Sequence, residues 1–255
     1  MSGDDICVRF VDVRKSFGRQ VVLDGLSFEL GRGRTLGIMG GSGSGKSVTL
    51  RHVVGLMEAD SGLVEVEGHD MSSISPRALR DLRLQMGYVF QSGALINWLT
   101  VAQNLALPLQ ENSDLGAEEI EQRVQDKLEL VHVPDAGAKF PSEISGGMKK
   151  RVALARALIT DPRIVLYDEP NAGLDPQISR SINQLMRELS ERLGVTALVV
   201  EHRIECLKTV ADEVLYLQEG RALVHEPIDS FFRPTHPRLV EFLGDQADTG
   251  ARNAP

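Results

Sequence analysis

The feature that constrains the fold most is a glycine-rich loop set between an apolar run and a helical stretch. Residues 40–47 read GGSGSGKS. Four of them fit the pattern G-x-x-x-x-G-K-[ST]: Gly40, Gly45, Lys46 and Ser47. The apolar run at 35–39 predicts a buried strand before the loop, and residues 47–56 predict a helix after it. This strand–loop–helix unit is typical of an α/β fold.

The chemistry of the loop suits a chain of phosphates. Glycines let backbone N–H groups point inward at phosphate oxygens, and the helix N-terminus adds partial positive charge. Lys46 would neutralise the β- and γ-phosphates, and the Ser47 hydroxyl would ligate Mg²⁺. The alternative is an accidental glycine-rich turn, which the strand–loop–helix context disfavours. The predicted nucleotide-binding residues are Gly40, Gly41, Ser42, Gly43, Ser44, Gly45, Lys46, Ser47 and Val48.

A second apolar run ends in two carboxylates. Residues 164–169 read IVLYDE, so a buried strand would deliver Asp168 and Glu169 to the carboxyl edge of the sheet. Asp168 would hold Mg²⁺, and Glu169 would polarise the attacking water as a general base. Two solvated acids at an ordinary strand end are the alternative. The phosphate loop in the same chain favours the catalytic interpretation.

The remaining pattern predicts one α/β domain over residues 1–245. Alternating apolar residues at 6–10 and 26–30 predict an N-terminal antiparallel β segment, and strands alternate with helices after residue 145. That alternation predicts a mostly parallel core sheet. Residues 92–159 are predicted to be an inserted helical subdomain, which leaves a core of residues 1–91 and 160–245. Residues 246–255 are predicted to be a disordered tail.

Composition excludes some classes of function. The formal net charge of −8 argues against broad binding to nucleic acid or anionic lipid. Cys7 and Cys206 lie far apart without metal-type spacing, which favours a reducing cytosolic setting. No apolar run approaches the roughly 18 residues that a bilayer span needs. A role in a membrane process would therefore be played from the cytosolic side, docked to a partner.

Residues 144–157 read ISGGMKKRVALARA and resemble the signature motif of ABC ATPases, usually written LSGGQ. In that family the signature of one subunit closes over the γ-phosphate held by the phosphate loop of the other. The resemblance assigns Ser145, Gly146, Gly147 and Met148 to the signature. Met148 stands where the family has Gln, which puts one polar contact in doubt. A Ser-Gly-Gly cap on an ordinary helix is the alternative.

Other elements of the ABC family follow in order over residues 6–243. Gln91 resembles the glutamine that senses Mg²⁺, and Asp175 resembles the aspartate at the dimer seam. His202 resembles the switch histidine that contacts the γ-phosphate, and Phe17 resembles the aromatic that stacks on adenine. Taken alone, such a histidine is often structural and such a phenylalanine is often core. The resemblance implies an ABC-type P-loop ATPase that uses ATP and Mg²⁺.

The resemblance also implies roles for each group. The predicted catalytic residues are Glu169, His202 and Gln91, and the predicted Mg²⁺ ligands are Ser47, Gln91 and Asp168. The family usually has Ser or Thr before the switch histidine, whereas this chain reads Glu201-His202-Arg203. Glu201 and Arg203 would either alter the hydrolysis rate or pair with each other on the surface. We expect the surface pair.

Residues 90–111 read FQSGALINWLTVAQNLALPLQE and resemble the ATPases of Mce-type lipid transporters, which include the Mla phospholipid system. The resemblance implies a homodimer on the cytoplasmic face of the inner membrane, an integral-membrane permease, a periplasmic Mce-domain protein and phospholipid as cargo. It implies no nucleic acid. The alternatives are the ATPase of another ABC importer or exporter, for amino acids, metals or lipoproteins, and an ABC ATPase acting on nucleic acid or the ribosome.

The same segment contains candidate permease contacts. Four residues would offer an apolar socket to a short cytosolic helix of the permease: Ala94, Leu95, Ile96 and Trp98. Internal packing is the alternative, most of all for Leu95 and Ile96. Trp98 is harder to assign to the core because tryptophan is enriched at interface hot spots.

Overall fold

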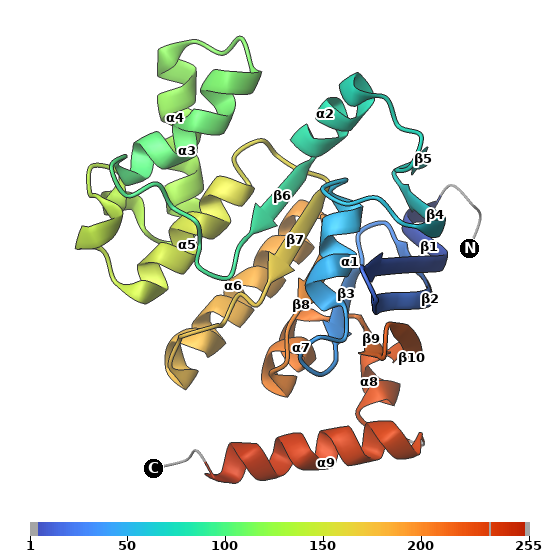
Figure 1. The fold of residues 1–255 in the computed structure, drawn as a ribbon. Helices are drawn as coiled ribbons and strands as arrows, with labels where there is room; N and C mark the ends of the chain where they lie inside the picture. Colours follow the sequence, from blue (N-terminus) through green and yellow to red (C-terminus); the bar gives the residue numbers. More distant parts are fainter. Residues whose placement is uncertain (1–4, 235, 253–255) are drawn as a thin grey trace.

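The computed structural model describes residues 5–234 and 236–252 of the chain, and the fold of these residues is built on a pair of sheets (Figure 1). The first is antiparallel, in the order β2-β1-β4-β5. Its strands are β1 (Ile6–Phe17), β2 (Gln20–Gly31), β4 (Ser61–Val66) and β5 (His69–Asp70). This sheet confirms the predicted N-terminal antiparallel segment, although β1 and β2 are longer than the alternating runs indicated.

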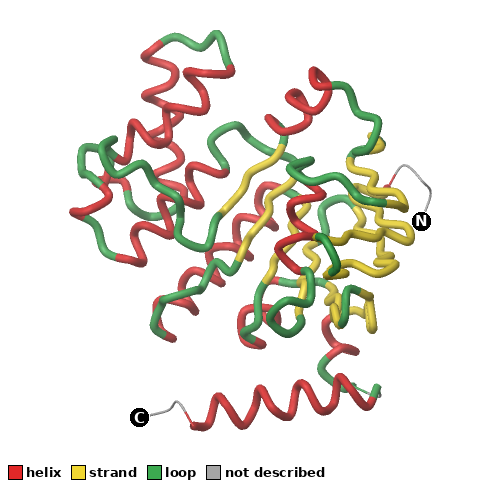
Figure 2. Tube along the Cα trace, viewed as in Figure 1, coloured by secondary structure: helices red, strands yellow, loops and turns green. Residues whose placement is uncertain are grey.

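The second sheet has the order β10-β9-β3-β8-β7-β6. Its strands are β3 (Thr35–Met39), β6 (Met86–Val89), β7 (Ile164–Asp168), β8 (Thr196–Val200), β9 (Glu213–Gln218) and β10 (Arg221–Pro227). All neighbouring pairs are parallel except β9 with β10. The loops that follow β3, β7 and β8 therefore lie together along the carboxyl ends of the strands, which form the lower edge of the sheet in Figures 1 and 2.

Helices cover the second sheet on both faces. The helices of the described residues are α1 (Lys46–Val53), α2 (Pro76–Leu84), α3 (Val101–Asn112), α4 (Ala117–Leu130), α5 (Gly146–Ala157), α6 (Pro176–Leu193), α7 (Ile204–Val210), α8 (Ile228–Phe231) and α9 (Pro237–Arg252), and not all of them contact the sheet. Figure 1 shows α3, α4 and α5 together beside β6, in the span predicted as a helical subdomain. Among the residues that the structure describes, no helix has the length and apolar character needed to cross a bilayer.

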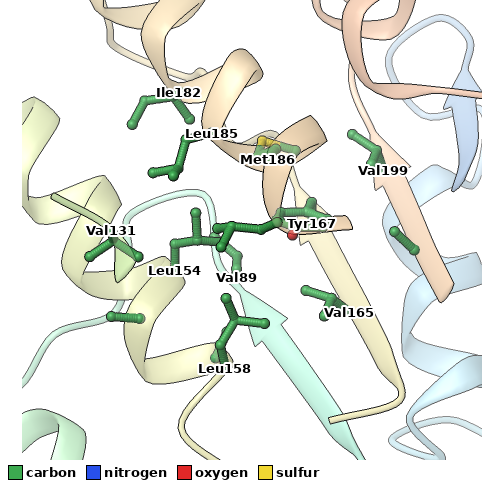
Figure 3. Packing of buried hydrophobic residues seen from close by; sticks show 14 of the residues in the cluster. Val89, Val131, Leu154, Leu158, Val165, Tyr167, Ile182, Leu185, Met186 and Val199 are labelled. Carbon is green, nitrogen blue, oxygen red and sulfur yellow. The ribbon is translucent and has the colours of Figure 1, made fainter. Parts of the chain in front are cut away.

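The run IVLY of β7 is apolar throughout because both faces of its sheet are buried. Ile164 and Leu166 pack into the cluster shared with β3 and α1. Val165 and Tyr167 point into the other cluster, where Leu154 of α5 and Met186 of α6 meet them (Figure 3). The strand is thus fixed from two sides, and its last residue, Asp168, emerges at the lower edge.

The C-terminal helix differs from the prediction. The sequence predicts a disordered tail from residue 246, whereas α9 continues to Arg252; residues 253–255 lie outside the described residues. The helix is anchored at its start by buried Leu239 and by the ring of Phe242, whose centre lies 4.8 Å from that of Tyr216. Residues 245–252 contain no proline, so a helix nucleated by this anchor can continue through them.

Candidate nucleotide-binding site

A cavity of about 440 Å³ opens at the lower edge of the second sheet. Most of its lining comes from the phosphate loop, and the rest comes from four other segments. The lining residues are Gln20, Val22, Gly40, Gly41, Ser42, Gly43, Gly45, Lys46, Ser47, Val48, Glu169, His202 and Phe242. The structure therefore gathers the predicted phosphate loop, except Ser44, with two of the three predicted catalytic residues. Ser44 lies behind the loop and is buried.

Two glycines make the loop possible. A Cβ atom on Gly40 would lie 2.2 Å from the carbonyl oxygen of Leu217, so no larger residue fits there. Gly45 precedes α1 with a φ of 106°, a conformation that side chains disfavour. Its absent Cβ would lie 2.7 Å from Leu23. The strand-to-helix turn is thus close-packed against β2 and β9, which leaves its inner side free for a ligand.

Lys46 rests on the loop itself. Its Nζ atom donates to the carbonyl oxygens of Gly40 and Gly41, both at 2.9 Å. Burial lowers the pKa of the Lys46 ammonium, and the nearby carboxylates Glu169 and Asp168 oppose that shift. The ammonium is therefore held close to the cavity in a setting where an anion would stabilise its charge.

Ser47 and Asp168 form the candidate Mg²⁺ site. The Ser47 hydroxyl donates to Oδ1 of Asp168 at 3.1 Å, and the Tyr88 hydroxyl donates to Oδ2 at 3.2 Å. Burial, reinforced by Asp168, raises the pKa of Tyr88, which keeps that hydroxyl protonated as a donor. A hydroxyl and a carboxylate side by side are oxygen ligands of the kind Mg²⁺ takes together with phosphate oxygens and water. The residues present therefore fit the ion.

Glu169 has an unusual backbone. Its φ is 48°, in the left-handed region that non-glycine residues seldom adopt, and its N–H donates to the carbonyl of Val200 at 2.9 Å. Its Oε2 atom accepts a hydrogen bond of 3.1 Å from the side-chain amide of Gln91. Backbone strain of this kind persists only where neighbouring structure holds it, and it is common at functional sites. The structure thus places the Gln91 amide on Glu169, not on Asp168.

The expected surface pair between Glu201 and Arg203 is wrong. Glu201 is fully buried, because its N–H continues the ladder to Ile38 of β3 before the chain turns. The guanidinium of Arg203 instead donates to the Ser179 hydroxyl at 2.8 Å and to the Leu174 carbonyl at 3.3 Å. The sequence could not reveal this burial, because a charged residue directly after an apolar strand usually faces water.

The signature residues lie apart from this cavity. Ser145 caps α5, accepting from the Met148 N–H at 3.3 Å, and both Ser145 and Gly146 are exposed. Gly147 is buried against Ile178 of α6, and Met148 packs partly into the core. The capping role weighed as the alternative is therefore present, and it leaves the start of α5 facing solvent.

Asp175 caps α6 in the same manner. Its Oδ1 atom accepts from the N–H groups of Gln177 and Ile178, at 2.9 and 3.0 Å. Phe17 ends β1 with about half of its surface exposed, and the Lys15 ammonium lies 5.9 Å from its ring centre. Neither residue lines the cavity of its own chain.

Sequence reasoning missed several residues at the site. Gln20 and Val22 line the cavity from the strand after Phe17, and Phe242 lines it from α9. Tyr88 reaches Asp168 because β6 pairs with β7. Gln20 and Val22 follow the turn after Phe17, the residue predicted to stack on adenine, so the sequence did contain a local indication of their position. Strand order and the path of α9 carry no local signal, so Tyr88 and Phe242 were not predictable in this way.

A second groove of about 400 Å³ lies between β6 and α3. Ala94 and Ile96 line it, as the socket prediction required, together with Phe90 and Pro108. Leu95 instead packs against the core cluster, which was the alternative given for it in place of the permease socket. Trp98 is 80% exposed and stands beside the groove without lining it.

A family model described as ABC transporter matches residues 23–172. This chain belongs to the ABC transporter family. The methionine import ATP-binding protein of Rhizobium etli is 40% identical over 225 residues, covering 88% of this chain and 62% of that protein. Its counterpart in Brucella abortus is 39% identical over 237 residues, covering 92% of this chain and 64% of that protein. The chain thus spans less than two thirds of the length of these relatives.

Solved structures agree with the fold. The protein cbiO1 of Clostridium perfringens, part of an ABC transporter complex, aligns with a TM-score of 0.83 and 28% identity, covering 92% of this chain and 93% of that one. A dimeric ATP-binding cassette bound to ADP and phosphate aligns at 0.78 with 30% identity, covering 87% and 98%. The predicted ABC ATPase fold is confirmed. The two relatives found by sequence are methionine import ATP-binding proteins, so they support the family but not the Mce-type branch.

Proposed function

We propose that this chain binds MgATP in the cavity and hydrolyses it as the ATP-binding subunit of an ABC transporter. One observation carries the proposal. Lys46, the Ser47–Asp168 pair and Glu169 come from two distant segments and converge on one cavity edge. Phosphate recognition, metal ligation and a general base are the groups that hydrolysis of a nucleoside triphosphate requires.

The side chains divide the work. The loop amides and Lys46 bind the phosphates, and bound Mg²⁺ would neutralise developing charge on them. Glu169 accepts the proton of the attacking water, and the Gln91 amide holds that carboxylate in place. His202, which lines the cavity, contacts the γ-phosphate. Phe17 stacks on adenine at the outer end of the site.

We further propose that two copies complete two sites. Ser145, Gly146 and Asp175 face away from their own cavity, so they are free to meet the phosphates and the seam of a second copy. Each copy would contribute one phosphate loop and one signature, which makes the interface isologous. ATP would then favour the closed dimer because the closed dimer has more contacts with it.

The cargo follows best from the relatives. Their names favour an importer of methionine or a similar amino acid. In such an importer we place the permease on the groove lined by Ala94 and Ile96, and we expect a periplasmic amino-acid-binding protein to deliver the cargo. Phospholipid is the second candidate, favoured by the resemblance of residues 90–111 to Mce-type ATPases. In both cases the chain would work at the cytoplasmic face of the inner membrane and would bind no nucleic acid.

Glu169→Gln tests the catalytic proposal. The amide cannot take a proton from water, so phosphate release should fall by at least about 100-fold. ATP binding should persist, and the variant should accumulate as a closed dimer, measured by size-exclusion chromatography with and without MgATP. Hydrolysis at the wild-type rate would remove Glu169 from its role, and wild-type protein that releases no phosphate from MgATP would remove the function.

Deleting the gene for this chain in its source organism distinguishes the two candidate cargoes. Loss of radiolabelled methionine uptake, restored by the wild-type chain but not by Glu169→Gln, supports the amino-acid importer. Unchanged uptake together with altered phospholipid content of the outer envelope supports the lipid transporter.

A further inference from the structure

The carboxylate of Glu201 is fully buried directly before the cavity residue His202. Its Oε1 atom accepts from the backbone N–H of His202 at 2.9 Å and from that of Arg203 at 3.2 Å. The same atom lies 3.2 Å from Nδ1 of the His202 ring. Burying a carboxylate is costly unless its hydrogen bonds offset the lost hydration. Oε1 is therefore the atom around which the turn after β8 is built.

The ammonium of Lys150 interacts electrostatically with this carboxylate. Lys150 of α5 is buried close by, with its Nζ atom donating to the Gln91 carbonyl at 2.6 Å. Burial lowers the pKa of Lys150, and the negative charge of Glu201 opposes that shift. Burial, with Glu201 adding to it, raises the pKa of the Cys206 thiol, so the thiol stays neutral. Oε2 of Glu201 has no hydrogen-bond partner among the described residues, so the hydrogen-bonding contacts concentrate on Oε1.

The His202 ring needs such a support. Its side chain is 48% exposed at the cavity wall, where an unsupported imidazole would exchange between rotamers. A carboxylate oxygen repels the lone pair of an unprotonated nitrogen, so the 3.2 Å separation between Oε1 and Nδ1 favours a proton on Nδ1. The other nitrogen, Nε2, is then left for a ligand in the cavity.

We propose that Glu201 is a positioning residue that holds the His202 imidazole with Nδ1 protonated and Nε2 directed at the terminal phosphate. The inference deepens the proposed function, since it rests on His202 meeting that phosphate. Nε2 can donate to a phosphate oxygen only when it also carries a proton. A serine or threonine at position 201 would supply a hydroxyl there without the charge.

Arg203 extends the arrangement. Its N–H shares Oε1 of Glu201 with His202, and its guanidinium holds Leu174 and Ser179 on either side of Asp175. One buried carboxylate thus fixes both the residue at the phosphate and the residue that holds the start of α6. Loss of the carboxylate should loosen the ring first, because the ring has the more exposed position.

Nitrogen NMR of histidine-labelled protein tests the geometry without relying on hydrolysis. Above the titration range of histidine, the His202 ring in the wild type should be in the Nδ1-protonated tautomer, assigned with His202→Gln. Glu201→Gln should retain it, because the two backbone N–H groups require an oxygen at Oε1. Glu201→Ala should shift the ring toward the Nε2-protonated tautomer. An Nε2-protonated ring in the wild type would overturn the proposal.

Steady-state kinetics test the consequence. Removing the outer partner of a metal-ligating histidine usually costs about 10- to 100-fold, and for His202, to which we assign no metal, we take the lower end of that range. We expect kcat for MgATP to fall about tenfold in Glu201→Ala and less in Glu201→Gln, with KM for ATP within about twofold. Glu205→Gln, the same change at an exposed position of α7, is the control. If the wild type hydrolyses MgATP and Glu201→Ala has the same kcat, this inference alone is overturned. If the wild type does not hydrolyse MgATP, the proposed function is overturned.

Discussion

At the scale of single residues, the site depends on side chains that reach one residue from different elements of the fold. Asp168 is the clearest case, because the Ser47 hydroxyl contacts one of its oxygens and the Tyr88 hydroxyl contacts the other. The tyrosine fixes the carboxylate plane from β6 and leaves Oδ1 directed toward the phosphate loop. Tyr88 is thus a supporting residue of the proposed Mg²⁺ site, and no motif contains it.

Tyr88→Phe tests that role. The variant loses one hydrogen bond to a carboxylate, a contact worth about 1.5–3 kcal/mol when buried and less at this half-buried position. We expect the Mg²⁺ concentration for half-maximal ATP hydrolysis to rise about threefold to tenfold. Thermal unfolding should change little, since the ring stays packed on Phe90. An unchanged Mg²⁺ dependence would show that Asp168 needs no such support.

The residues that were predictable are those whose chemistry is local. The phosphate loop and the pair Asp168–Glu169 could be placed from one strand and one turn each. Glu201 could not, because its burial depends on the ladder to β3, which lies more than a hundred residues earlier in the chain. A run of apolar residues indicates that a strand is buried, but it does not indicate whether the residue after the run is buried as well.

At the scale of elements, the start of α5 offers a matched pair of glycines. A Cβ atom on Gly147 would lie 2.9 Å from Cγ2 of Ile178, whereas one on Gly146 would meet nothing within 4 Å. In the isolated chain, Gly147→Ala should therefore lower Tm by about 2–4 °C, and Gly146→Ala should leave it unchanged or slightly higher. Calorimetry measures both.

The same pair separates packing from function. In the closed dimer, Gly146 would approach the partner's phosphates, where a methyl group has no room. Gly146→Ala should thus reduce MgATP hydrolysis while leaving stability intact. If Gly146→Ala hydrolyses ATP normally, the start of α5 is only a helix cap.

Trp98 belongs to the connection between β6 and α3, beside the groove lined by Ala94 and Ile96. Because 80% of the Trp98 surface is exposed in the isolated chain, most of the free energy available from burying its ring would be gained on binding a partner. Trp98→Ala should reduce recovery of the permease with the tagged chain from membranes, while ATP binding stays unchanged. Leu56→Ala is the control, since Leu56 is 64% exposed and does not line the groove. Equal recovery from both variants would exclude Trp98 from the interface.

Elements were predictable where a pattern repeats within them. The core strands and most helices follow from apolar runs and periodicity. The helix α2 went unpredicted although Ser75 caps it and Pro76 occupies its first turn, a signal that was available in the sequence. The extent of α9 was not available, because it depends on Phe242 meeting Tyr216 across the fold.

At the scale of the whole molecule, the two halves of the proposed site lie on different surfaces of one chain. The phosphate loop lines the cavity, while Ser145 and Gly146 face solvent elsewhere. A site completed within the chain would require α5 to move to the cavity, against the packing of Gly147 on α6. Completion by a second copy needs no such change, so each site should combine one loop with the other copy's signature.

Mixing two inactive variants tests this arrangement. Lys46→Ala removes the ammonium that binds the phosphates from the phosphate loop. Gly146→Asp places a carboxylate where the partner's γ-phosphate should bind. Neither variant alone should therefore hydrolyse MgATP. In a mixed dimer, one site combines both lesions and the other combines two intact halves. Equal mixing gives mixed dimers in about half of the pairs, so hydrolysis should recover to about a quarter of the wild-type rate if sites act independently. Hydrolysis at the wild-type rate by Gly146→Asp alone would mean that each chain hydrolyses ATP on its own surface.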